Sequence, residues 1–150
     1  MIVAYFDGSC EPVNPGGIAT YGFVIYFDDV KIGEGRGLAT EPWSENATNN
    51  IAEYRALIEA LKWLIKHGLK GEVTVRGDSK LCIMQMRGKY AVKAARIIPL
   101  YNEAKALSKF FKKVKFEWVP REQNKEADLQ SEQALQDCLA TSHYPSKTCN

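Results

Sequence analysis

The first forty residues contain three apolar runs separated by turn residues, which predicts three strands. The runs cover residues 2–9, 18–27 and 30–39. The Pro- and Gly-rich sequence CEPVNPGG between the first two runs predicts a loop. Asp28 and Asp29 predict a tight turn between the second and third runs. The pattern therefore indicates an antiparallel meander whose last two strands form a hairpin over residues 18–39.

The remainder of the chain alternates between helical and strand patterns. Apolar residues recur at helical spacing from Asn49 to His67, and Gly68 ends that helix. The later elements are a strand over 71–77, a helix over about 79–86, a helix from Lys93 or Ile97 to Lys112, a strand over 114–119 and a helix after Asn124. Pro99 lies in the first turn of the third helix or kinks it. The order βββαβααβα predicts an α/β fold with a five-stranded mixed sheet flanked by helices.

Length and composition favour one domain in the cytoplasm. The 150 residues, 45% of them hydrophobic, can form one hydrophobic core but are too few for two domains that each have a core of their own. We expect a domain over residues 1–140 and a loosely held tail over residues 141–150. There is no apolar stretch of 18 residues, so no membrane span is expected. The start MIVAYFDG has no basic region or cleavage site of a signal peptide, so a cytoplasmic location is the default expectation.

Charge and cysteine content limit how the protein could bind nucleic acid or metal. A net charge of +2 argues against a polycation, so nucleic-acid contacts would have to come from local basic segments. Two such segments are MRGKYAVKAAR and SKFFKKVK, which could equally be solvated faces. Cys10, Cys82, Cys138 and Cys149 have no CxxC spacing, which argues against a zinc site. Cys82 and Cys138 are most simply core thiols, whereas Cys149 could form a disulfide that pins the tail.

Four acidic residues carry the strongest chemical signal. Asp7 follows an apolar run, Glu53 lies early in a long helix, Asp78 follows a strand and Asp128 lies in the last helix. Ligands in α/β sheets gather at the carboxyl ends of parallel strands, so Asp7 and Asp78 are expected to be close together. Helical spacing places Glu53 on one stripe with Leu57 and Leu61, toward the sheet, and Asp128 on one face with Ser131 and Leu135. Clustered carboxylates without His or Cys partners suit a hard cation such as Mg²⁺ or Mn²⁺.

Each acid also has a purely structural alternative. Asp7 and Gly8 could begin a turn, Asn50 with Glu53 matches a capping box, Asp78 could cap the helix at Ser79, and Asp128 could be an exposed helix residue. All four in one place are harder to explain structurally, because buried unpaired carboxylates repel one another without a cation.

The motifs around these acids resemble the type 1 ribonuclease H family. The likeness covers Ile2 to about Leu139 and rests on DGSC with a following NPGG, on TNNIAE, on GDSK and on NKEAD, in that order. It implies a ribonuclease H fold and endonucleolytic cleavage of the RNA strand of an RNA/DNA hybrid, leaving 5′-phosphate and 3′-hydroxyl ends. Members with similarly short loops sometimes also cut double-stranded RNA.

The resemblance assigns the metal ligands and several substrate contacts. Asp7, Glu53, Asp78 and Asp128 match the family's metal-binding acids, with Asp7 bridging two Mg²⁺ ions about 4 Å apart, Glu53 and Asp78 on one and Asp128 on the other. The positions that match contacts to the RNA minor groove and its 2′-hydroxyls are Gly8, Ser9, Cys10, Asn14 and Asn49. Thr48 and Asn49 match a pocket for a phosphate of the DNA strand, although Thr48 could simply be a helix N-cap. We expect the protein to act as a monomer.

Two departures from the family pattern are visible. The basic helix and loop that some members insert between the second and third helices is absent or much reduced here, where only RGKYAVKAAR connects them. The loop VPREQN lacks the family's histidine, and Arg121 or Glu122 stands in its place. Arg121 is therefore a candidate phosphate or product contact.

Two rival interpretations remain at this point. Transposases, integrases and junction resolvases share the fold, but they place their acids differently, and TNNIAE with NKEAD speaks against them. A catalytically silent module that only binds hybrids is disfavoured because all four acids are present. Cleavage with Mg²⁺ and with chelator discriminates the second rival.

Overall fold

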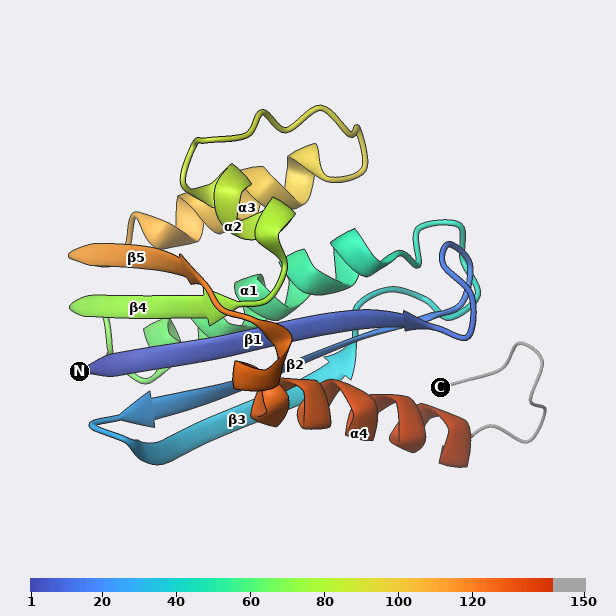
Figure 1. Cartoon of the computed structure of the whole chain (residues 1–150), viewed down its shortest axis with the longest axis horizontal. Helices are drawn as coiled ribbons and strands as arrows, with labels where there is room; N and C mark the ends of the chain where they lie inside the picture. The colour runs from blue at the N-terminus through green and yellow to red at the C-terminus, as the bar shows by residue number, and fades with distance from the viewer. Residues whose placement is uncertain (142–150) are drawn as a thin grey trace.

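The fold is a single five-stranded mixed sheet with helices on both faces (Figure 1). The computed structural model describes residues 1–141. The strands are β1 (Ile2–Glu11), β2 (Ile18–Phe27), β3 (Val30–Leu38), β4 (Glu72–Gly77) and β5 (Lys113–Trp118). Their order across the sheet is β3-β2-β1-β4-β5, with β1, β2 and β3 antiparallel and β1, β4 and β5 parallel. The predicted fold class and strand arrangement are confirmed.

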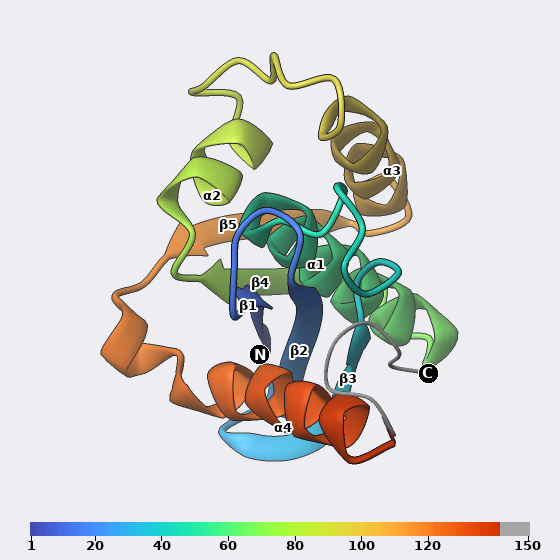
Figure 2. The same cartoon turned by 90° about the vertical axis from the view of Figure 1, so that its right-hand side faces the viewer.

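The helices form two layers around the sheet (Figure 2). The helices are α1 (Asn49–Lys66), α2 (Lys80–Met86), α3 (Ile98–Ser108) and α4 (Lys125–Thr141), with a short 3₁₀ turn over Arg121–Gln123. The first three lie on one face and α4 lies alone on the other. The main core lies under α1, where Leu57, Leu61 and Leu64 are fully buried, and α1 packs mainly against β1 and β2. The helical stripe predicted for α1 is thus confirmed.

Two element boundaries differ from the prediction. Strand β1 continues to Glu11 because Cys10 and Glu11 pair with Ala19 and Ile18 of β2. Helix α3 begins only at Ile98, with Pro99 in its first turn, and ends at Ser108. The apolar and basic residues that follow it form turns before β5, although their pattern resembles a continuing helix.

The helix caps decide between the alternatives that the sequence left open. The Thr48 hydroxyl accepts a hydrogen bond from the Ile51 amide at 3.1 Å, so Thr48 is the N-cap of α1 and the capping box of Asn50 with Glu53 does not form. Ser79, and not Asp78, caps α2 by accepting from the Cys82 amide at 3.2 Å. Neither Glu53 nor Asp78 is therefore explained by capping.

Cys82 and Cys138 are both buried, as predicted, but the expectation of a core thiol is confirmed only for Cys82, since Cys138 is disulfide-bonded. Cys149 and the rest of the predicted tail beyond Thr141 lie outside the described residues, so a disulfide at Cys149 stays a prediction. Within residues 1–141 the helices are all too short or too polar to cross a bilayer.

Candidate active site

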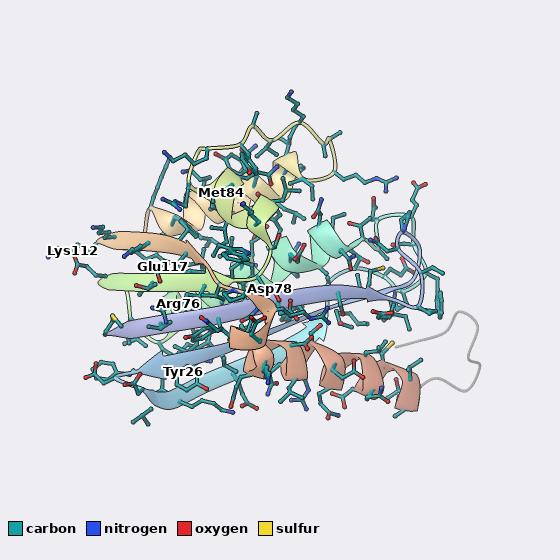
Figure 3. The ribbon with its side chains drawn as sticks, in the orientation of Figure 1. Tyr26, Arg76, Asp78, Met84, Lys112 and Glu117 are labelled. Atoms are coloured by element: carbon teal, nitrogen blue, oxygen red, sulfur yellow. The ribbon has the colours of Figure 1, made fainter. Side chains whose placement is uncertain are left out.

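The four acids line one cleft of about 480 Å³ at the carboxyl ends of β1 and β4. Each comes from a different part of the fold: Asp7 from β1, Glu53 from α1, Asp78 from the residue after β4, and Asp128 from α4. Figure 3 shows Asp78 near the middle of the sheet, between the strand ends and α4. The cleft is also lined by Gly8, Ser9, Glu11, Asn49, Trp118 and Arg121.

Asp7 is the central carboxylate of the cleft. Its side chain is only 7% exposed, and its carboxyl group interacts with those of Asp128 and Asp78. Burial is the largest cause that raises the pKa of Asp7, and the charges of Asp78, Asp128 and Glu53 add to it, so that the pKa rises from 3.8 to about 9. Without a cation, Asp7 therefore holds a proton at neutral pH.

Two further acids experience the same crowding. Burial, followed by the charge of Asp78, raises the pKa of Glu53 from 4.5 to about 8, although a hydrogen bond with Ser79 opposes the rise. Burial also raises the pKa of Asp78, while hydrogen bonding to Asp7 and the charge of Arg121 lower it. The cleft thus concentrates negative charge that Arg121 offsets only in part.

Two glycines next to Asp7 let helices approach the sheet from opposite faces. A Cβ atom on Gly8 would lie 2.3 Å from the Ala52 carbonyl carbon and 2.5 Å from the Glu53 amide nitrogen of α1. A Cβ atom on Gly22, which pairs with Asp7 across β1 and β2, would lie 2.4 Å from the Ser131 amide nitrogen of α4. The absence of side chains at these two positions is what brings Glu53 and Asp128 up to Asp7.

Buried polar contacts hold α4 against the sheet. Asn124, which is 1% exposed and directly precedes α4, donates from Nδ2 to the Phe6 carbonyl at 2.9 Å. About two turns further on, the hydroxyl groups of Ser131 and Thr20 are 2.9 Å apart, and Ser131 also lies 3.3 Å from Ser9. These contacts fix the position of Asp128 relative to Asp7 on β1.

The donor set fits a hard divalent cation. All four carboxylates supply oxygen ligands, which suit Mg²⁺ and Mn²⁺. Burial first, and mutual repulsion second, raise the pKa values of Asp7, Glu53 and Asp78, and a cation would offset both effects. Within residues 1–141, no three or more His, Cys, Asp or Glu side chains stand in an arrangement that could already enclose one metal ion.

Sequence reasoning missed three residues at this site. Trp118 and Glu11 line the cleft, and the Trp118 indole donates from Nε1 to the Asp78 carbonyl at 3.2 Å. Asn124 stands in the NKEAD motif, but its contact with the Phe6 carbonyl joins residues 118 positions apart. Such long-range contacts leave no local signal in the sequence. The position of Trp118 at the end of a predicted strand could, however, have suggested that it lies near the acids at the strand ends.

The predicted substrate-binding residues divide between two hollows and the core. Asn14, Thr48 and Asn49 line a separate hollow of about 370 Å³ together with Arg96, and Asn49 reaches both hollows. Asn49 accepts from the Cys10 amide at 2.8 Å, and its own amide donates to Asn14 at 3.2 Å. The Cys10 thiol points away from both hollows and donates to the carbonyls of Val13 and Ala47.

Comparison with known proteins agrees with this architecture. A family model described as reverse transcriptase-like matches residues 6–134. The N-terminal RNase H domain of Rv2228c from Mycobacterium tuberculosis superposes with a TM-score of 0.81 at 36% identity, covering 90% of this chain and 93% of that one. LC11-RNase H1, in complex with an RNA/DNA hybrid, superposes with a TM-score of 0.83 at 32% identity, covering 93% and 99%. The chain belongs to the type 1 ribonuclease H family.

Two curated relatives extend the comparison. The bifunctional protein Rv2228c of Mycobacterium tuberculosis is 39% identical over 135 residues, which are 89% of this chain and 35% of that protein. Ribonuclease HI of Halobacterium salinarum is 33% identical over 134 residues, which are 89% of this chain and 64% of that protein. The chain thus spans about a third of the length of the mycobacterial relative.

Proposed function

We propose that the protein is a divalent-metal-dependent endoribonuclease that hydrolyses the RNA strand of RNA/DNA hybrids. The observation that carries the proposal is the convergence of Asp7, Glu53, Asp78 and Asp128 on one cleft. Family membership supports it, as does the complex of the similar LC11-RNase H1 with an RNA/DNA hybrid. The ribonuclease H domain is assigned to residues 1–140.

The reaction is hydrolysis of a phosphodiester. A water molecule adds to phosphorus, the bond from phosphorus to the 3′-oxygen breaks, and a proton from that water ends on the 3′-oxygen. The products are a 5′-phosphate and a 3′-hydroxyl. Two Mg²⁺ ions, or Mn²⁺ in their place, would be held by the four carboxylates, with Asp7 contributing to both. When bound, such ions supply positive charge that lowers the pKa of the water and offsets charge on the phosphate and the leaving oxygen.

The residues of the chain prepare the site for this reaction. Asp7 and Glu53 must give up the protons that their raised pKa values retain, so cation binding is coupled to proton release. Arg121 has the charge and the place in the cleft to hold a phosphate oxygen or the 5′-phosphate product. Gly8, Ser9 and Asn49 line the same cleft, which supports the inference that they contact 2′-hydroxyl groups, the feature that distinguishes RNA from DNA.

The second hollow is suited to a phosphate of the DNA strand. Thr48 and Asn49 lie at the N-terminus of α1, where amide groups point outward, and Asn14 and Arg96 line the same hollow. Arg96 already donates to the Glu45 carbonyl at 2.6 Å, which holds its guanidinium at the rim. Use of Thr48 as the N-cap does not exclude this contact, because a hydroxyl group can both donate and accept.

Cleavage of end-labelled duplexes tests the proposal. RNA/DNA, RNA/RNA and DNA/DNA duplexes of one sequence are incubated with Mg²⁺, with Mn²⁺ or with chelator, and product ends are identified. We expect cleavage of RNA in the hybrid with either metal and none with chelator. Cleavage of the RNA/RNA duplex would extend the substrate range. Hybrid binding without any cleavage would instead identify a silent binding module.

A further inference from the structure

The outer edge of the sheet carries a groove that the proposed catalysis does not use. It has a volume of about 1070 Å³ and lies between α2, the C-terminal end of α3 and β5. Figure 3 labels three of its lining residues, with Met84 on α2, Lys112 at the far end of β5 and Glu117 nearer the cleft. Residues of the two basic segments noted in the sequence, 86–96 and 108–115, meet here.

The rim of the groove is strongly cationic. It is lined by Arg87, Lys89, Lys105, Lys112, Lys113 and Lys115. The first five are exposed, and within residues 1–141 none of those five forms an ion pair. The groove's one acidic lining residue, Glu117, is already paired with Arg76 at 2.8 Å and with Lys115 at 2.9 Å. Five positive charges therefore face the groove without a counterion from the described chain.

The floor of the groove is apolar, and one side of it is an open sheet edge. Met84, Phe111 and Phe116 contribute to the floor. Within residues 1–141, strand β5 is the last strand of the sheet and pairs only with β4, so the backbone groups along its other edge have no strand partner in that part of the chain. Cations above an apolar floor suit a ligand that combines phosphates with exposed bases. A duplex presents mainly phosphates and would leave the floor without a counterpart.

Trp118 joins this groove to the acidic cleft. It lines both hollows, is 46% exposed, and is anchored by its hydrogen bond to the Asp78 carbonyl. An exposed indole at this junction offers a surface on which a base can stack. The continuity of the two hollows favours a strand of the same nucleic acid over an acidic polypeptide added to the edge of β5.

We propose that the groove between α2, α3 and β5 binds the single-stranded extension of a hybrid whose paired part lies in the acidic cleft. The five unpaired cations contact its phosphates, and Trp118 stacks a base where the strand leaves the duplex. This inference rests on the proposed function, because it takes a hybrid as the substrate. It implies that hybrids carrying an unpaired strand bind better than blunt hybrids.

Binding of a dye-labelled oligothymidine of about 12 residues, followed by anisotropy in chelator at about 50 mM salt, tests the groove without any cleavage. The test variant is Lys112→Ala with Lys113→Ala. The matched control is Lys31→Ala with Lys66→Ala, which removes the same charge from β3 and from the end of α1. We expect about tenfold weaker binding for the test variant and a shallower salt dependence, by about 1.4 in the logarithmic slope for two lost contacts. The control should stay within about twofold of wild type.

Hybrid cleavage then separates the two proposals. Wild type should have a lower KM for a hybrid with a single-stranded extension than for a blunt one, and the test variant should lose that difference while cutting the blunt hybrid normally. Equal oligothymidine binding by the two double variants would overturn the proposal that the groove binds a single strand. Displacement of the oligothymidine by polyglutamate of equal charge would also overturn it. Failure of the wild type to cut any hybrid would instead overturn the proposed function. The oligothymidine binding of the two double variants could still be compared, because that measurement does not depend on cleavage.

Discussion

Asp7 is the central carboxylate of the proposed metal site. Because its carboxyl group meets both Asp78 and Asp128, removing its charge affects every ligand around it. We expect Asp7→Asn to lower the cleavage rate by at least about a hundredfold while hybrid binding in chelator is kept. The same change at Asp29, in the exposed turn between β2 and β3, is the control. Cleavage by Asp7→Asn within a few fold of wild type would contradict the metal-site assignment.

Arg121 is expected to have a smaller effect. Its guanidinium cannot act as a base near neutral pH, so it can only hold a phosphate oxygen or the product. We expect Arg121→Ala to slow cleavage about tenfold, which corresponds to roughly 1.4 kcal/mol. Single-turnover and steady-state rates locate the loss in the chemical step or in product release. Wild-type values for both rates would show that Arg121 has no catalytic role.

The sequence allowed the four acids to be identified, but it did not show what holds them. Asp7 and Asp78 directly follow the paired stretch of the parallel strands β1 and β4, although β1 itself continues to Glu11, and Glu53 shares the buried stripe of α1. Simple rules about strand ends and helical faces therefore place these three acids together. Trp118 and Asn124 could not be found in this way, because their partners at Asp78 and Phe6 lie far away in the chain. Cys10 was expected to contact substrate, but its thiol faces the core.

At the scale of elements, the approach of α4 to the sheet depends on Gly22. A Cβ atom there would meet the α4 backbone, which cannot move as easily as a side chain. We expect Gly22→Ala to cost about 1–3 kcal/mol of unfolding free energy and to reduce cleavage further by displacing Asp128. Gly71→Ala is the control, since nothing lies within 4 Å of its added Cβ. Urea unfolding and cleavage rates measure both effects, and equal behaviour of the two variants would argue against this role for Gly22.

The errors in the predicted element boundaries also arise because contacts between distant parts of the chain cannot be seen in a local sequence pattern. Helical periodicity continues from α3 into the residues before β5, so the pattern alone extends the helix too far. The end of β1 lies in a sequence rich in Pro and Gly, yet its last residues are held by pairing with β2. Within residues 1–141, local patterns identified the strands and α-helices in order but missed the 3₁₀ turn at Arg121–Gln123. The ends of the elements depend on tertiary partners that no local window contains.

For the whole molecule, the crowded carboxylates make stability depend on pH when no cation is bound. The pKa values of Asp7 and Glu53, about 9 and about 8, lie above their ordinary values of 3.8 and 4.5. The folded protein therefore binds protons more tightly than the unfolded chain between these limits. The stabilisation is complete below about pH 4 and is lost as pH rises through about 8 to 9.

Urea unfolding in chelator at pH 5.5 and pH 8.5, which lie early and late in this loss, measures the effect. We expect a lower midpoint at the higher pH, a smaller difference for Asp7→Asn, and a wild-type difference for Asp29→Asn. Added Mg²⁺ should restore stability mainly at the higher pH, where the carboxylates can ionise. Equal midpoints at the two pH values in chelator would show that the acids are not crowded in solution.

The indole of Trp118 also gives the protein an intrinsic optical reporter. The sequence contains three tryptophans, Trp43, Trp63 and Trp118, and among them Trp118 lines the acidic cleft. Its hydrogen bond to the Asp78 carbonyl couples its surroundings to the backbone at a proposed cation ligand. We expect Mg²⁺ and hybrid each to change the emission of wild type, and Trp118→Phe to be silent to both. Occupancy of the cleft could then be followed in real time, with no label on the enzyme or the nucleic acid.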